Sequence, residues 1–196
     1  MHASLTGAAL VVAFLAASAA PVFSADLEKG RAKSQPCAAC HGADGNATIP
    51  GTPSLAGQPI FFTHWQLIKF RDGRRKNDQM KPFVDALSEA DLADLAAFYA
   101  AQKPARRPAP ADPKKVEDGK KAAEFYHCTS CHRRDFSGNE QVPRLAGQDL
   151  EYLRKQIRGF KEKTASDLDG TMTMAAQPIT EEDVDLLAKY LASLGG

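Results

Sequence analysis

Two short stretches, Cys37-Ala-Ala-Cys-His41 and Cys128-Thr-Ser-Cys-His132, decide how this sequence folds. They begin 91 residues apart. A second motif, Pro53-Ser-Leu-Ala-Gly-Gln58, returns 90 residues later as Pro143-Arg-Leu-Ala-Gly-Gln148. Separate motifs that recur at a nearly constant spacing indicate an internal duplication, in which each copy forms a similar structural unit. We therefore predict two homologous domains.

The predicted domains span residues 26–102 and 114–196, and residues 103–113 join them. This linker holds four prolines in eleven residues. Such a composition favours extended polyproline geometry, so the linker is predicted to be a semi-rigid spacer.

Both domains are predicted to be helical. Residues 60–71 and 150–160 carry apolar side chains at three- and four-residue spacing, which is typical of an amphipathic helix. Ser88-Glu-Ala-Asp91 and Thr180-Glu-Glu-Asp183 are capping-box patterns, and each opens an apolar run. No alternating run rich in Val, Ile and Thr predicts a sizeable sheet. The expected fold class is all-α, with two tandem domains.

The charge of the chain excludes one class of partner. There are 25 Lys and Arg residues against 24 Asp and Glu residues, for a net charge of +1. A nucleic-acid-binding protein needs a clear basic excess, so we expect no nucleic-acid partner.

The first 25 residues contain no Lys, Arg, Asp or Glu and hold an apolar core followed by small residues. This pattern predicts a secretory signal peptide that is cleaved between Ala19 and Ala25. A retained N-terminal membrane anchor is the alternative. Export predicts that the mature protein works in an oxidising compartment, the bacterial periplasm.

The duplicated Cys-x-x-Cys-His motif indicates covalent haem attachment. Two thiols three residues apart can each form a thioether to one vinyl group of a haem, and the following His can bind the iron. The chain has four Cys, and the two motifs use all of them: Cys37, Cys40, Cys128 and Cys131. We predict two covalently bound haem c groups, with His41 and His132 as iron ligands. A zinc site or a redox-active Cys pair is the alternative.

The sixth position of each iron is expected to hold a Met thioether, a soft ligand that favours ferrous iron. After Met1 the chain has only Met80, Met172 and Met174. Met80 and Met172 each lie eight residues before the Ser or Thr that caps the last helix of their domain. This shared register favours Met80 and Met172 as ligands, and Met174 is the alternative in the second domain.

Pro53 and Pro143 are the predicted acceptors for the ligating imidazoles. Proline keeps its carbonyl, and a metal-bound His usually donates its second ring N–H to such a group. His64 and His127 are not expected to be ligands. We interpret His64 as a solvated helix residue.

The motifs of this chain resemble those of a known family. The run from Cys37 to Asn46, the Pro-x-Leu-Ala-Gly-Gln motif, a Met before a Leu-Ser-x-x-Asp helix start and the duplication are together similar to the dihaem class I cytochromes c, in particular the cytochrome c4 family. The resemblance covers essentially all of residues 26–196. It implies two class I cytochrome c domains related by a pseudo-twofold axis, each with a low-spin His/Met-ligated iron.

The resemblance also assigns the site residues. The thioether cysteines correspond to Cys37, Cys40, Cys128 and Cys131, the axial ligands to His41, Met80, His132 and Met172, and the His-orienting prolines to Pro53 and Pro143. The second copy departs from the family pattern, because Arg133-Arg134 replaces Gly42-Ala43 and the loop before Met172 is two residues longer.

The expected function is that of a periplasmic electron carrier that exchanges single electrons and is not an enzyme. One alternative is a dihaem cytochrome subunit of a dehydrogenase, such as a sulfide-oxidising flavocytochrome. The other is a dihaem peroxidase, which needs an open iron position.

The expected partners are redox proteins: a donor dehydrogenase or quinol-oxidising complex, and an acceptor terminal oxidase or reductase. Association with a membrane surface stays open, and the chain is expected to be a monomer or a weak dimer. A basic stretch from Lys69 to Lys81 is a candidate surface for steering an acidic partner, and a solvated charged loop is the alternative.

Overall fold

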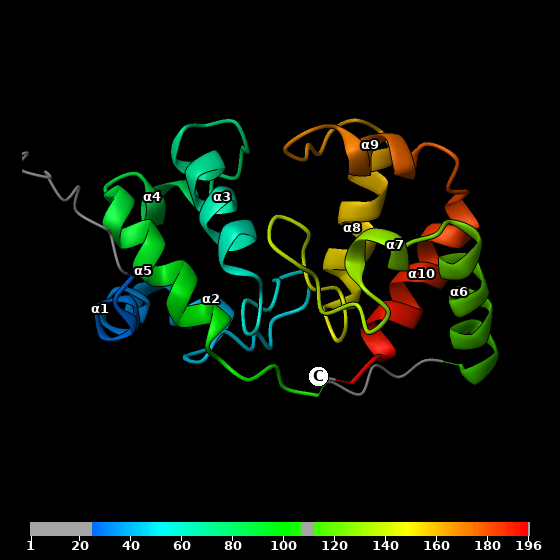
Figure 1. Cartoon of the computed structure of the whole chain (residues 1–196), viewed down its shortest axis with the longest axis horizontal. Coiled ribbons are helices and arrows are strands. Elements are labelled where there is room, and N and C mark those ends of the chain that lie inside the picture. Colours follow the sequence, from blue (N-terminus) through cyan, green and yellow to red (C-terminus); the bar gives the residue numbers. More distant parts are fainter. Residues whose placement is uncertain (1–24, 107–111, 196) are drawn as a thin grey trace, which may run out of the picture.

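The computed structural model describes residues 25–106 and 112–195. Its helices fall into two groups that follow the duplication (Figure 1). The first domain contains α1 (Leu27–Lys33), the 3-10 helix η1 (Gln35–Cys37), α2 (Ala38–His41), α3 (Ile60–Arg71), α4 (Lys81–Val84) and α5 (Glu89–Ala100). The second contains α6 (Pro113–Phe125), α7 (Thr129–His132), α8 (Leu150–Lys161), α9 (Thr171–Ala176) and α10 (Glu181–Ser193). Among the described residues an isolated bridge between Asn139 and Val142 is the only strand-like pairing, so the all-α class is confirmed.

Each domain is built around its last helix. α5 packs against α1 and α3, and α10 packs against α6 and α8. The short helices α2 and α7 carry the Cys motifs, and α4 and α9 follow or contain the candidate Met ligands. Figure 1 shows the two domains side by side, and their α-helices follow one another in the same order, with η1 present in the first domain.

The helix starts follow local sequence chemistry. The Ser88 side chain accepts a hydrogen bond from the Asp91 N–H, and the Asp91 carboxylate accepts one from the Ser88 N–H in return. The Thr180 hydroxyl likewise accepts from the Asp183 N–H at 3.1 Å. α3 spans the residues predicted for it. α6 begins at Pro113, which the sequence placed at the end of the linker, because a proline suits the first helical position and Asp112 caps the start.

A glycine lets the first and last helices of each domain cross at backbone contact. A Cβ atom on Gly30 would lie 2.2 Å from the Asp94 carbonyl oxygen, and one on Gly119 would lie 2.2 Å from that of Leu186. No side chain fits in that space. The crossing of α1 with α5, and that of α6 with α10, therefore depends on glycine.

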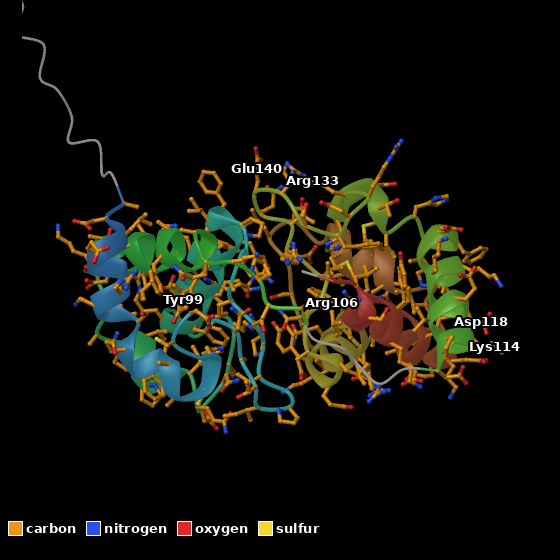
Figure 2. All side chains as sticks on the ribbon, turned by 90° about the horizontal axis from the view of Figure 1, so that it is seen from below. Tyr99, Arg106, Lys114, Asp118, Arg133 and Glu140 are labelled. Atoms are coloured by element: carbon orange, nitrogen blue, oxygen red, sulfur yellow. The ribbon has the colours of Figure 1, made fainter. Side chains whose placement is uncertain are left out.

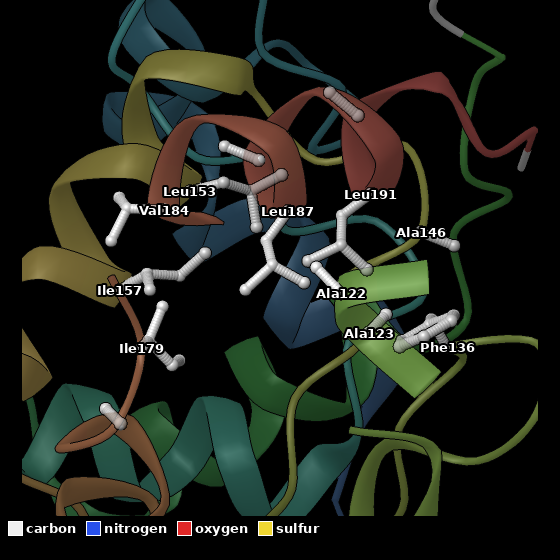
Figure 3. Close-up of a cluster of buried hydrophobic side chains, with 13 residues drawn as sticks. Ala122, Ala123, Phe136, Ala146, Leu153, Ile157, Ile179, Val184, Leu187 and Leu191 are labelled. Carbon is white, nitrogen blue, oxygen red and sulfur yellow. The ribbon is translucent and has the colours of Figure 1, made fainter. Parts of the chain in front are cut away.

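The second domain has the larger continuous apolar core. Its buried side chains include Leu153 and Ile157 from α8 and Val184, Leu187 and Leu191 from α10 (Figure 3). In the first domain the corresponding buried cluster consists of Leu95, Phe98 and Tyr99. Cys37 packs against that cluster, and Cys128 packs against the cluster of the second domain, so each Cys motif adjoins its core.

A residue of the second domain accepts a hydrogen bond from the first turn of α3. Its N-cap, Pro59, makes no side-chain cap, and the Phe62 N–H donates to the Glu140 carbonyl of the second domain at 3.0 Å. Figure 2 labels Glu140 on the loop beside the first domain. In α8 the matching N–H, that of Tyr152, is capped locally by the Asp149 side chain. The duplication is therefore not symmetric at the boundary between the domains.

The predicted signal peptide lies almost entirely outside the described residues, as does the middle of the linker. Where the linker is described, the Asn46 side chain holds it: Asn46 Nδ2 donates to the Lys103 carbonyl and Asn46 Oδ1 accepts from the Ala105 N–H. In the described part of the chain, no helix has the length and apolar character needed to cross a membrane.

Candidate functional site

Each Cys motif forms a short helix that places its two thiols one turn apart. Cys37 is the N-cap of α2, and Cys40 lies within that helix. Cys128 and Cys131 occupy the same positions at α7. Residues three apart on a helix share a face, so the two sulfur atoms of each pair are presented together, as attachment of one planar group by two thioethers requires. All four cysteines are free of disulfides.

The environment of the two half-buried thiols, Cys37 and Cys128, bears on the two alternatives to haem attachment. Burial raises the pKa of the Cys37 thiol, and it raises that of Cys128 to about 11. Zinc binding and thiol–disulfide exchange both need a thiolate, which a lowered pKa favours. Among the described residues, no three His, Cys, Asp or Glu side chains come together in a metal-binding group. The structure thus gives a zinc site no cluster of ligands among the described residues, and the raised pKa of Cys37 and Cys128 disfavours the thiolate that redox exchange uses.

The two candidate iron-binding imidazoles are held in the same way. His41 Nδ1 lies 2.9 Å from the Pro53 carbonyl oxygen, and His132 Nδ1 lies 2.9 Å from that of Pro143. Burial lowers the pKa of both imidazoles, which keeps them neutral. A neutral imidazole that donates from Nδ1 leaves Nε2 with a free lone pair for a metal.

The candidate Met ligands share a backbone support that sequence reasoning missed. The Met80 N–H donates to Asn77 Oδ1 at 3.1 Å, and the Met172 N–H donates to Asp167 Oδ2 at 2.5 Å. Asn77 and Asp167 are equivalent residues of the repeat, 90 positions apart. A side chain of the same shape therefore holds the Met amide in both domains, although the second loop is longer.

Exposure separates the two Met residues of the second domain. Met172 is half-buried and packs against the apolar core. Met174 is 76% exposed. The arrangement of the chain supports Met172 rather than Met174 as the residue turned toward the interior.

The first domain also contains a buried donor that fits a carboxylate-bearing prosthetic group. The indole Nε1–H of Trp65, on α3, is buried and meets no hydrogen-bond acceptor among the described residues. Buried polar groups are normally paired, and an unpaired donor is costly. A haem carries propionate carboxylates, so its chemistry matches this donor as well as the thiol, imidazole and thioether groups of the same domain.

His64 differs from the sequence expectation. It is half-buried, and its Nε2 lies 3.5 Å from a carboxylate oxygen of Glu89 at the start of α5. His64 is therefore only partly solvated and not fully so as predicted, because Glu89 of α5 lies beside its ring.

Two glutamines link the haem-side loops across the domain boundary. Gln58 Nε2 donates to the Arg144 carbonyl at 2.9 Å, and Gln58 Oε1 accepts from the Arg144 N–H at 3.0 Å. In the opposite direction, Gln148 Nε2 donates to the Ser54 carbonyl at 2.9 Å, and Gln148 Oε1 accepts from the Ser54 N–H at 2.7 Å. We call these four hydrogen bonds the glutamine clamp.

The glutamine clamp adjoins both imidazoles. Ser54 and Arg144 directly follow the prolines that accept from His41 and His132. Each domain therefore fixes the peptide beside the imidazole acceptor of the other. The repeated motif contained both glutamines, but a sequence pattern does not reveal that each one bonds to the opposite copy.

Comparison with known proteins places this geometry in a family. The family model described as "Cytochrome c" matches residues 116–195, and the one described as "Cytochrome C oxidase, cbb3-type, subunit III" matches residues 27–98. Cytochrome c4 of Pseudomonas aeruginosa is 36% identical over 180 residues, which cover 86% of this chain and 89% of that protein.

Two further comparisons bear on structure and on function. The crystal structure of reduced recombinant cytochrome c4 from Pseudomonas stutzeri matches with a TM-score of 0.79 at 32% identity, covering 87% of this chain and 100% of that one. A thiosulfate dehydrogenase electron acceptor of Thiomonas intermedia is 34% identical, over 80% of this chain and 77% of that protein.

Two cytochrome c domains, each with a Cys-x-x-Cys-His motif, bind two covalently attached haem c groups. The protein is a dihaem electron-transfer cytochrome. The chain belongs to the cytochrome c4 family.

Proposed function

We propose that this protein is a periplasmic carrier of single electrons, in which His41 and Met80 ligate the first haem iron and His132 and Met172 ligate the second. One observation carries the proposal. In each domain the His donates to a proline carbonyl at the same distance, and the Met amide is held by the equivalent Asn77 or Asp167 side chain. Two copies that differ in loop length keep the same supports for the same two donor types.

The polypeptide holds in place the His nitrogen and Met sulfur atoms that are proposed to ligate iron. The Pro53 and Pro143 carbonyls select the Nδ1–H tautomer and set the ring orientation, which leaves Nε2 as the ligand atom. The loops that end at Met80 and Met172 each present a soft thioether, which stabilises the ferrous state and raises the reduction potential. When bound, each haem supplies an iron that alternates between ferrous and ferric states.

The same ligands support the proposal that the protein is not an enzyme. With one His and one Met as ligands, each haem iron would have no position open to a substrate. A dihaem peroxidase needs one iron with an open or displaceable ligand. The presence of a supported Met in both domains argues against that alternative.

We also propose that the protein is exported and works in the periplasm. The support is the uncharged apolar segment within residues 1–25, followed by small residues. Determination of the N-terminal residue of the protein purified from the periplasmic fraction tests this. Cleavage between Ala19 and Ala25 is expected, and an intact Met1 on membrane-bound protein would overturn it.

A second candidate function is electron acceptance from a particular dehydrogenase. It is supported by the relative named thiosulfate dehydrogenase electron acceptor, which matches 80% of this chain. A flavoprotein partner that oxidises sulfide stays a prediction. Reduction of the purified protein by an added dehydrogenase of either class, measured against the same dehydrogenase without the cytochrome, separates these partners.

The basic stretch does not form the free positive surface considered from the sequence. Lys69 is buried, Arg71 pairs with Glu89, and Lys81 pairs with Asp85. The guanidinium of Arg74 pairs with Asp72, and that of Arg75 bonds to Gln66 and to Tyr152 of the second domain. Five of the basic side chains are therefore buried, paired or hydrogen-bonded within the molecule, while Arg74, Lys76 and Lys81 stay exposed to solvent, so the stretch resembles a partly solvated charged loop more than a free steering patch.

The ligand assignment is tested by replacing each Met with Ala in the haem-loaded protein. Ferric haem with a bound thioether has a weak far-red charge-transfer band that is lost when the sulfur leaves the iron. We expect Met80→Ala and Met172→Ala each to remove about half of this band, since two Met-ligated irons contribute to it. Met174→Ala is the matched control and should leave the band intact. Loss of half the band in Met174→Ala, or its absence from the unmodified protein, would overturn the assignment.

A further inference from the structure

Lys69 is a buried cation that the proposed electron-transfer site does not use. It lies in the last turn of α3, and its side chain is only 3% exposed. Its ammonium crosses the domain boundary and donates to the carbonyl oxygen of Ser166 and, at 3.1 Å, to the Ser166 hydroxyl. An amine is costly to bury unless its hydrogen bonds are satisfied, so this contact is a specific one.

The partner of Lys69 belongs to the loop that leads to Met172. Ser166 is followed by Asp167, whose Oδ2 accepts from the Met172 N–H and whose Oδ1 accepts from the Thr173 hydroxyl at 2.8 Å. A path of contacts therefore runs from Lys69 by hydrogen bonds to Ser166, along the backbone to Asp167, and by a hydrogen bond to the Met172 N–H. It begins in the first domain and ends at the proposed iron ligand of the second.

The charges of Lys69 and Asp167 favour the same contact between the domains. Burial lowers the pKa of Lys69, with a further contribution from the nearby Arg75, while the Asp167 carboxylate acts in the opposite direction. The Asp167 carboxylate, which accepts from the Met172 N–H, thus attracts the Lys69 ammonium, which donates to Ser166. Opposite charges in a poorly solvated boundary interact more strongly than they do in water.

The duplication offers no matching contact for Met80. The repeat counterpart of Lys69 is Gly159, which has no side chain to reach across the boundary. The carbonyls of both residues accept from an N–H of their own loop, that of Lys69 from Arg75 and that of Gly159 from Thr164, each at 2.8 Å, so the two copies differ here in the side chain. The Met80 loop is also shorter, because only two residues separate Asn77 from Met80, whereas four separate Asp167 from Met172. A longer loop loses more conformational entropy when it is ordered, so the Met172 loop has the greater need of an external anchor.

We propose that Lys69 is a positioning residue for Met172, by which the first domain holds the axial thioether of the second haem in place. The proposal rests on the ligand assignment made above. It implies that the stability of the iron–sulfur bond made by Met172 depends on a lysine of the other domain, a dependence for which the repeat gives Met80 no equivalent residue.

The test compares Lys69→Met with Lys76→Met in the haem-loaded full chain. Lys76 is an exposed lysine a few residues further along the same stretch, so its replacement removes the same charge without breaking the contact. In ferrous protein, each iron-bound Met methyl group gives its own strongly upfield proton resonance, and Met172→Ala identifies which one belongs to the second haem. The far-red band of the ferric protein is followed during heating.

We expect Lys69→Met to lose the second-haem half of the far-red band at a lower temperature, with about a tenfold smaller ratio of bound to dissociated thioether, because a charge-assisted hydrogen bond is lost. One of the two reduction steps should shift to lower potential while the other is unchanged. Lys76→Met should resemble the unmodified protein. Lys69→Arg, which keeps the charge and the donors, should restore most of the stability.

Failure of the inference differs from failure of the ligand assignment. If the unmodified protein lacks two upfield Met methyl resonances, the assignment itself is wrong. If both resonances are present and Lys69→Met either behaves like Lys76→Met or weakens both haems equally, Lys69 is not a positioning residue for Met172. Should Lys69→Met not accumulate as folded protein, Lys69→Gln, which keeps a neutral donor, provides the same comparison with a smaller expected effect.

Discussion

At the scale of single residues, the two copies show how the same backbone shape is reached with different side chains. Gly42 ends the Cys-motif helix of the first domain with a φ of 79°. Arg133 ends the corresponding helix of the second domain with φ 67° and ψ 165°. That region suits glycine and is unfavourable for residues with a Cβ atom. The second domain therefore carries local backbone strain next to His132.

This strain makes Arg133→Gly a stabilising change. We expect the free energy of unfolding to rise by about 1 kcal/mol, since glycine adopts this conformation without steric cost. The exposed hydrogen bond from Arg133 to Asn139 is lost and offsets part of the gain. Chemical denaturation of the haem-loaded protein measures the effect. Arg134→Gly is the control and should give no stabilisation, and equal results for both variants would refute the strain.

Among single residues, the cysteines proposed to attach haem and the histidines that follow them could be identified from the sequence. The Cys-x-x-Cys-His motif is local, so spacing along the chain is enough to identify its members. The predicted Pro53 and Pro143 acceptors lie within hydrogen-bond distance of the two imidazoles. Asn77 and Asp167 were not predicted, because a side chain that holds a neighbouring amide leaves no distinctive pattern beyond equivalence in the repeat.

At the scale of the elements, helix positions followed from caps and apolar periodicity, but helix crossings did not. The contact of α1 with α5 depends on Gly30, and nothing in the local sequence marks that glycine as a crossing point. Gly119 lies at the equivalent crossing of α6 with α10, and only an alignment of the two copies would have shown that both have a glycine at this point.

Gly30→Ala tests the crossing. The added Cβ would overlap the Asp94 carbonyl, and backbone atoms cannot move away cheaply. We expect a loss of about 1–3 kcal/mol in the free energy of unfolding. Lys29→Ala, on the exposed side of the same helix, should change stability by less than about 0.5 kcal/mol. A Gly30→Ala protein as stable as the Lys29→Ala control would show that α1 and α5 are not held at backbone contact.

At the scale of the whole molecule, two kinds of contact join the domains: some follow the duplication and others do not. The glutamine clamp follows the duplication, since Gln58 and Gln148 make the same bonds in opposite directions. The Lys69 contact and the Glu140 contact to α3 do not follow it. The sequence predicted the two domains, but it could not predict how they dock. Docking depends on which side chains meet across the boundary, and no periodicity within one domain records that.

Removal of the clamp should uncouple the domains. In the Gln58→Ala, Gln148→Ala double variant, four hydrogen bonds are lost at a buried boundary, and each contributes about 0.5–1.5 kcal/mol. We expect calorimetry to show two separated unfolding transitions where the unmodified protein shows one.

Gln102→Ala is the matched control, because the Gln102 side chain donates to the Phe98 carbonyl within its own domain. It should leave a single transition. Two transitions in the unmodified protein, or one in the double variant, would contradict the role given to the clamp.

Electron transfer by this protein depends on two haems bound to one polypeptide, and the intact mass of the protein purified from cells able to attach haem c tests their presence most directly. We expect the mass of the mature chain plus two haem groups, with the haem retained after denaturation because thioether bonds to Cys37, Cys40, Cys128 and Cys131 hold it. A mass equal to that of the polypeptide alone, or one that falls to it on denaturation, would contradict covalent attachment and with it the proposed function.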